Sequence, residues 1–160
     1  MNGVVQRVMV FVDGTEESIT AAQYAIMLCH DLHAELEALY VINTRALSDL
    51  VKTHIFLAAE QDEYQHDLEA DADRYLQHVI ELASSKGIAV TTTKTRGTVY
   101  QEIKKRVVEQ EIDLLVIGEL ARIRSRRDEF FDEAERAMRS VPCAVLIVKD
   151  EDRVWDLFET

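Results

Sequence analysis

Two short apolar runs near the C-terminus constrain the fold of this chain more than any other feature. The first run, 112–118, includes Asp113 near its start and ends with Gly118, and the second run spans 142–148. Such runs are typical of parallel strands that helices cover on both faces. Between them lie an arginine-rich loop and an amphipathic helical pattern at 129–139. The segment therefore predicts a strand, a loop, a helix and a further strand.

The same alternation of strand and helix patterns runs through the rest of the chain. It predicts a single α/β domain over 1–149, a doubly wound parallel sheet with helices on both faces. A tail at 150–160 carries Trp155 and Phe158, which we expect to dock on the domain or on a second subunit. The pattern at 44–59 is mixed and predicts a loop or an irregular helix. The remaining patterns indicate strands at 6–12, 34–43 and 88–95, and helices at 15–31, 60–85 and from 97 onward.

Composition excludes several classes of protein. The formal net charge of −12 argues against a nucleic-acid binder, because contacts with phosphates need a basic face. No apolar stretch is long enough to span a membrane, and no signal-peptide pattern is present at the N-terminus. Cys29 and Cys143 lie in apolar surroundings, which favours reduced thiols and a cytoplasmic protein. No catalytic constellation or metal-ligand spacing can be identified, so we expect no enzyme and no metal site.

The C-terminal segment resembles the corresponding part of the universal stress protein family. The strand that ends at Gly118, the helix start at Ala134 to Arg136 and the closing strand at 141–148 match that family's pattern. The strand-turn-helix that contains Asp13, Gly14 and Thr15 is also similar to the family's beginning. The resemblance implies a five-stranded parallel sheet in the order 3-2-1-4-5, the adenine-nucleotide alpha-hydrolase-like fold.

The family's phosphate-binding loop is altered in this chain. Nucleotide-binding members carry G-x2-G-x9-G-[ST], in which glycines let backbone N–H groups approach phosphate oxygens. Gly118 matches the first glycine, but Ala121 and Phe131 stand at the other two glycine positions. Asp132 stands at the Ser/Thr position and would place a negative charge beside the phosphates. We therefore expect that ATP does not bind in the family's usual way and that no cofactor is held.

The resemblance also implies where a ligand would bind. In such sheets ligands lie beyond the carboxyl ends of the strands, where the strand order reverses. This places Asp13, Val41, Gly97 and Gly118 at one candidate site. Arg122 and the arginines that follow could hold an anion by side chains, and so binding of ATP or another adenine nucleotide remains the alternative.

We expect a homodimer that forms through the strand at 143–148. The family places its last strand at the edge of the sheet, where it pairs with its copy across a two-fold axis. An open edge as apolar as this one would favour aggregation, and a symmetric partner would cover it. The sequence thus predicts a non-enzymatic, dimeric stress-response or regulatory protein in the cytoplasm, without naming its signal or its partner.

Overall fold

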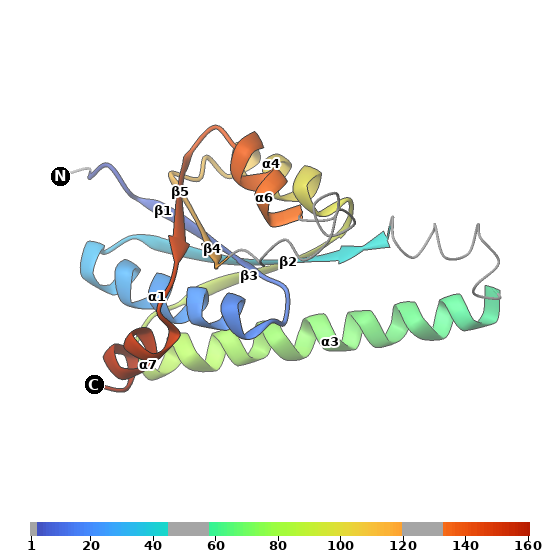
Figure 1. The fold of residues 1–160 in the computed structure, drawn as a ribbon, viewed down its shortest axis with the longest axis horizontal. Coiled ribbons are helices and arrows are strands. Elements are labelled where there is room, and N and C mark those ends of the chain that lie inside the picture. Colours follow the sequence, from blue (N-terminus) through green and yellow to red (C-terminus); the bar gives the residue numbers. More distant parts are fainter. Residues whose placement is uncertain (1–2, 45–57, 120–132) are drawn as a thin grey trace.

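A parallel sheet of five strands forms the centre of the protein in the computed structural model, which describes residues 3–44, 58–119 and 133–160 (Figure 1). The strand order is β3-β2-β1-β4-β5, and every neighbouring pair is parallel. This confirms the predicted fold and strand order. The strands are β1 (Arg7–Val12), β2 (Glu35–Asn43), β3 (Val90–Gly97), β4 (Leu114–Gly118) and β5 (Ala144–Val148).

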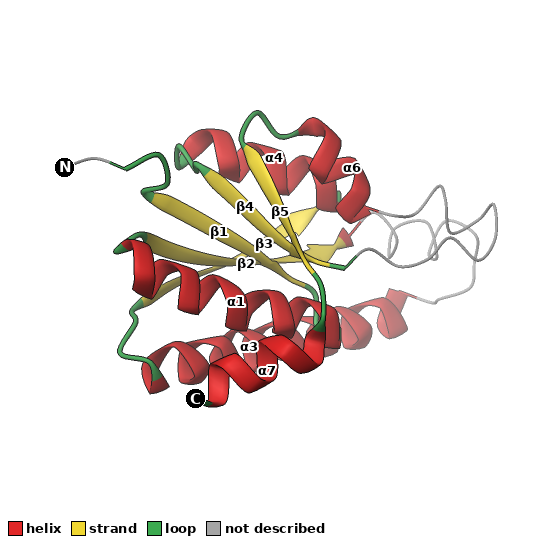
Figure 2. Cartoon of the chain, turned by 60° about the vertical axis from the view of Figure 1, so that its left-hand side comes forward, coloured by secondary structure: helices red, strands yellow, loops and turns green. Residues whose placement is uncertain are grey.

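Helices cover both faces of the sheet, as Figure 2 shows. One face carries α1 (Glu16–Leu32), α3 (Ala58–Ser85) and α7 (Glu151–Glu159), and the other carries α4 (Val99–Glu109) and α6 (Glu133–Ser140). The predicted strands and helices agree with these bounds to within a few residues. The start of the predicted 129–139 helix and most of 44–59 lie outside the described residues.

Alternation along the strands produces two separate cores. In β1, Val8, Val10 and Val12 face α1 and α3, whereas Met9 and Phe11 face α4. These five side chains are at most 6% exposed, as expected for a central parallel strand. The threonine-rich β3 lies at one edge of the sheet and is only partly buried, as a threonine-rich composition predicts.

The N-terminus of α1 has a side-chain cap. Thr15 is the N-cap residue, and its hydroxyl oxygen accepts a hydrogen bond from the N–H of Ser18 at 3.2 Å. Glu16 and Glu17 occupy the first turn, where a carboxylate interacts favourably with the helix dipole. Because the cap follows directly on β1, it fixes the turn at Asp13 and Gly14 at the carboxyl edge of the sheet.

The tail at 150–160 forms a helix that packs on its own domain. Val154 and Phe158 are 2% and 6% exposed and join the core around α1, and Lys86 lies over the Phe158 ring at 4.8 Å. Trp155 and Leu157 are 38% and 47% exposed. Phe158 therefore packs into its own domain in this structure. Trp155 is the exposed aromatic residue of α7.

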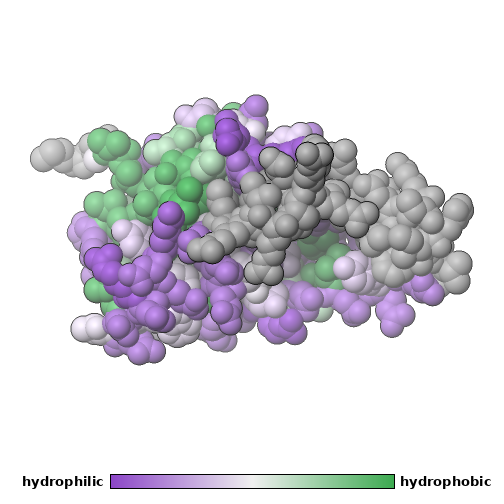
Figure 3. All heavy atoms as spheres, in the orientation of Figure 1, coloured by the Kyte–Doolittle hydropathy of each residue, from purple (hydrophilic) through white to green (hydrophobic). Residues whose placement is uncertain are grey.

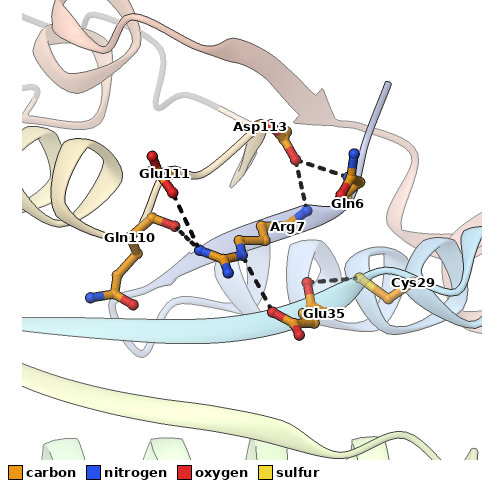
Figure 4. A network of polar contacts seen from close by, with 7 residues as sticks. All are labelled: Gln6, Arg7, Cys29, Glu35, Gln110, Glu111 and Asp113. Atoms are coloured by element: carbon orange, nitrogen blue, oxygen red, sulfur yellow. Dashed lines mark hydrogen bonds and ion pairs between the residues drawn. The ribbon is translucent and has the colours of Figure 1, made fainter. Parts of the chain in front are cut away.

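A polar network joins three strands at the opposite, amino-terminal edge (Figure 4). One carboxylate oxygen of Asp113 accepts hydrogen bonds from the backbone N–H groups of Gln6 and Arg7, each at 2.9 Å. The Arg7 guanidinium donates to the carbonyl of Gln110 at 3.0 Å and lies 3.5 Å from the Glu35 carboxylate. The network ties the loop before β4 to the start of β1.

Candidate ligand site at the carboxyl edge of the sheet

Asp13 lies in the turn between β1 and α1 and is exposed. Its Oδ1 accepts hydrogen bonds from the N–H of Thr15 at 3.0 Å and from the Thr15 hydroxyl at 2.6 Å. Its own N–H donates to the Ser18 hydroxyl oxygen at 3.3 Å. Within the described part of the chain these bonds use only Oδ1, and so Oδ2 remains as the acceptor that a ligand's hydroxyl or amino group could use.

Gly14, the next residue, lies beneath an aromatic side chain that sequence reasoning did not assign to the site. Its φ of 85° is one that glycine adopts readily, and a Cβ there would lie 2.6 Å from the ring of Tyr75 on α3. Tyr75 in turn stacks on Tyr40 of β2, with ring centroids 6.3 Å apart and planes inclined by 8°. The stacked pair thus forms one wall beside the Asp13 turn.

The Tyr40 phenol is kept in its neutral form. Burial raises its pKa, and the negative charges of Asp13 and Asp71 raise it further. The alternating pattern of β2 could have identified Tyr40 as facing α3, but nothing in the sequence indicates that Tyr75 would reach Gly14.

Val41 and Gly97 lie at the ends of the adjacent strands β2 and β3. The register pairs Val41 with Thr95 and Asn43 with Gly97. Val41 is 7% exposed and its side chain belongs to the core beneath α4, and so only its backbone could contact a ligand. Gly97 has a φ of 145°, and a side chain there would come within 3.1 Å of Cγ of Glu102.

Gly118 ends β4 and packs against the first turn of α1. A Cβ at this position would lie 2.5 Å from the carbonyl oxygen of Glu17. The packing of β4 on α1 therefore needs a residue without a side chain at this position. This requirement does not depend on any contact of Gly118 with a ligand. Val10 pairs with Val116, and so β1 and β4 reach the carboxyl edge two residues later, at Val12 and Gly118.

The four described candidates thus lie on successive strands at one edge of the sheet. Arg122, together with Ala121, Phe131 and Asp132 of the altered loop, lies outside the described residues. Within the described ranges no cluster of three or more histidine, cysteine or acidic residues could hold a metal ion. No described helix is both long enough and apolar enough to cross a bilayer.

A carboxylate also lies at the start of α4, close to this edge. Oε2 of Glu133, the first residue of α6, accepts a hydrogen bond from the N–H of Tyr100 at 3.1 Å. The Arg136 guanidinium lies over the Tyr100 ring at 5.5 Å. The N-termini of α4 and α6 are therefore joined, a contact that the sequence does not predict.

Comparison with known proteins identifies the family to which this chain belongs. The model of the universal stress protein family matches residues 5–149, and the chain belongs to this family. Universal stress protein MJ0531 of Methanocaldococcus jannaschii is 26% identical over 146 residues, covering 90% of this chain and 82% of that protein. The helix α7 lies beyond the matched region.

Solved structures of family members share the fold. Universal stress protein UspA from Lactobacillus plantarum superposes with a TM-score of 0.73 at 20% identity, covering 92% of this chain and all of that one. A universal stress protein in complex with cAMP has a TM-score of 0.69 at 18% identity, covering 92% and 99%. A family protein from Arabidopsis thaliana with AMP bound has a TM-score of 0.65 at 15% identity, covering 92% and 94%.

Proposed function

We propose that this universal stress protein is a non-enzymatic, dimeric regulatory protein that does not hold ATP in the family's usual way. The observation that carries the proposal is the altered loop, in which Ala121, Phe131 and Asp132 replace two glycines and a Ser/Thr. A unit charge about 4 Å from a phosphate charge opposes binding by roughly 4 kcal/mol at an effective dielectric constant near 20. That repulsion corresponds to on the order of a thousandfold in affinity.

Isothermal titration with Mg-ATP tests this proposal directly. We expect a dissociation constant weaker than about 10 μM, the value that corresponds to roughly −7 kcal/mol. The triple variant Ala121→Gly, Phe131→Gly, Asp132→Ser removes steric bulk and the like charge, and so it should bind Mg-ATP more tightly than the parent. Binding by the parent at or below about 10 μM would contradict the proposal, and a folded triple variant with no gain would contradict the assignment of the loop.

A second candidate function is binding of an adenine nucleotide in a different way. The family proteins with AMP and with cAMP bound favour it, because both ligands contain an adenosine moiety without a triphosphate. The residues that would take part are Asp13, Gly118 and the arginine loop that contains Arg122. Native mass spectrometry of freshly purified protein separates the two functions, because it reports a retained nucleotide and the oligomer mass in one measurement.

The dimer is proposed to form through the open edge of β5. In the part of the chain that the structure describes, β5 has one strand neighbour, β4, and its other edge is unpaired. Figure 3 shows hydrophobic surface gathered over β5 and the segment before β1. Ala144 is exposed, and Val145, Leu146 and Ile147 are only partly buried. Antiparallel pairing of two such edges about a two-fold axis would satisfy both at once.

Light scattering on the purified protein at micromolar concentration tests the dimer. Replacing Val145 and Ile147 with lysine should give a monomer or an aggregate, because the charges would have to enter the seam. Deletion of 151–160 should weaken the dimer if α7 contributes to it through Trp155. A monomer for the unmodified protein would rule the interface out.

We propose a cytoplasmic location for this protein. Burial raises the pKa of the Cys29 thiol to about 12, and burial also raises the pKa of Cys143. Both thiols are therefore protonated at neutral pH and are poor nucleophiles, which suits structural cysteines in a reducing compartment. Localisation of a tagged protein by fractionation would test this.

A further inference from the structure

Thr95 of β3 carries a buried hydroxyl group that has no hydrogen-bond partner in the described part of the chain. Two residues earlier, on the same face of the strand, the Thr93 hydroxyl donates to Oε1 of Glu37 at 2.7 Å. An unpaired buried hydroxyl costs free energy, because it has given up its hydrogen bonds to water and gained none in the protein. The Thr95 hydroxyl is therefore a group that a bound molecule could pair.

The strand register places Thr95 in line with two residues of the candidate site. Val41 of β2 pairs with Thr95 directly. Val12, the last residue of β1, pairs with Tyr40, and so Asp13 follows at the level of Val41. Asp13, Val41 and Thr95 therefore form one row across the carboxyl ends of three neighbouring strands. Adjacent strands lie about 4.8 Å apart, and so roughly 10 Å separate the two ends of the row, a span comparable with the length of a nucleoside.

The two ends of this row differ in chemistry. Asp13 is exposed, and its Oδ2 can only accept hydrogen bonds, which suits a ligand's hydroxyl groups. Thr95 lies on the face of the sheet that α4 covers, where Val41 and Val99 belong to the apolar core. Its hydroxyl can both donate and accept, as the nitrogen atoms along the edge of an adenine base require. The row thus offers a polar, exposed end for a sugar and a more apolar end with one polar group for a flat base.

We propose that Thr95 is a base-recognising residue of the candidate site, and that its hydroxyl pairs with the polar edge of the adenine in an adenosine-containing ligand. Oδ2 of Asp13, at the other end of the row, accepts from a ribose hydroxyl of the same ligand. Thr95 as a residue is partly exposed, and a rotation about its χ1 angle turns the hydroxyl toward the ligand. This inference rests on the second candidate function above, that the edge binds an adenosine moiety.

The test removes the hydroxyl and keeps the shape of the side chain. Thr95→Val does this, and Thr95→Ser keeps a hydroxyl at the same position. Thr92→Val is the matched control, because it makes the same change on the opposite face of β3, where Thr92 pairs with Ala38 of the core around α1 and α3. Isothermal titration of each full-length protein with adenosine, and then with adenine, measures binding. Urea denaturation of the same proteins measures stability.

We expect Thr95→Val to raise the dissociation constant for adenosine at least about fivefold, because a polar atom of the bound base loses its partner. The loss should be the same for adenine, which lacks the ribose. Thr95→Ser and Thr92→Val should bind as the parent does. Thr95→Val should nevertheless be at least as stable as the parent, because it no longer buries an unpaired hydroxyl. Weaker binding without lower stability is the result that a purely structural role for the hydroxyl would not give.

Adenosine binding by Thr95→Val as tight as that of the parent would overturn the role of Thr95 and leave the adenosine-binding function standing. Loss of stability and binding together in this variant would also overturn it, because the hydroxyl would then support the fold. A loss for adenosine without one for adenine would overturn the assignment of Thr95 to the base. Failure of the parent itself to bind either ligand would instead overturn the adenosine-binding function, and the role of Thr95 with it. The two kinds of failure are therefore distinguishable.

Discussion

Arg106 of α4 directs its guanidinium at a single oxygen of Glu37 in β2. Nε and Nη2 donate to Oε1 at 2.8 and 2.7 Å, and the Thr93 hydroxyl donates to the same oxygen at 2.7 Å. Glu37 is 7% exposed, and its Oε2 has no hydrogen-bond partner within the described ranges. The pair joins α4 to the β2–β3 side of the sheet and depends on both members being present.

Removing one member should therefore be far worse than removing both. We expect Arg106→Met to lower the free energy of unfolding by about 3 kcal/mol, because it leaves a buried carboxylate uncompensated. The double variant Glu37→Met, Arg106→Met should recover most of that loss. Urea denaturation followed by circular dichroism measures both, and a double variant as unstable as the single one would contradict this account.

Gln23 in α1 is the opposite case, a buried polar side chain without a partner. It is fully buried, and neither its amide nitrogen nor its amide oxygen has a hydrogen-bond partner within the described part of the chain. Gln23→Met keeps the length of the side chain and removes the polar atoms that lack hydrogen-bond partners. We expect it to raise the free energy of unfolding by about 1 kcal/mol. Gln77→Met, at an exposed position of α3, is the control and should change stability by less than about 0.5 kcal/mol.

The packing of Gly118 on α1 predicts a large effect of a single methyl group. Gly118→Ala would bring Cβ within 2.5 Å of the Glu17 carbonyl oxygen, a backbone atom that cannot rotate away. We expect a loss of about 2 kcal/mol in the free energy of unfolding, the usual range for overpacking. Gly3→Ala should be neutral, since the nearest atom lies 4.0 Å from the added Cβ. A Gly118→Ala protein as stable as the parent would show that the strand end can shift.

The buried ring of α7 is predicted to matter to the whole domain. Phe158→Ala should lower the free energy of unfolding by about 3 kcal/mol, because it leaves a cavity in the core around α1. Leu157→Ala is the matched control: it is 47% exposed, and we expect a change below about 0.5 kcal/mol. Equal small effects would mean that α7 contributes little to the stability of the domain.

Asp113 predicts a dependence of stability on pH. The N–H of Gln6, and then that of Arg7, hold the pKa of its carboxyl group below the usual value. A lowered pKa in the folded state contributes stability at pH values above the unfolded-state pKa of about 3.9, and this contribution is lost as the pH falls through the folded-state pKa. Asp113→Asn should therefore be less stable than the parent at pH 7, and the difference should narrow below about pH 4. The exposed Asp156→Asn should track the parent throughout.

The strands and helices could be predicted from the sequence because the relevant signals are local. The apolar runs, the Thr15 cap and the threonine-rich β3 each depend on neighbouring residues, and the family resemblance supplied the strand order. The contacts at the candidate edge join residues far apart in the chain, such as Gly14 with Tyr75 and Tyr100 with Glu133. Periodicity can place each of these side chains on a face, but it cannot show which partner it meets.

The burial of Gln23 has the same origin. Its spacing along α1 from Ala22, Ala25 and Ile26 places it at the side of the apolar face, where a glutamine can reach water. It is nevertheless fully buried, and α1 has α3 and α7 as helical neighbours on this face of the sheet (Figures 1 and 2). The helix α7 lies outside the region that the family model matches, and so neither the local pattern nor the resemblance could anticipate that α1 packs against it.

The placement of β5 at the edge of the sheet, with α7 next in the chain, also determines how the protein would respond to a mechanical load. A pull on the C-terminus would first peel α7 from α1 and then unzip the edge strand β5 from β4, breaking hydrogen bonds one after another. A pull on the N-terminus instead loads β1, which is hydrogen-bonded on both sides and would have to break its bonds to β2 and β4 together. The two ends of the chain should therefore differ in mechanical strength, with the C-terminal end the weaker.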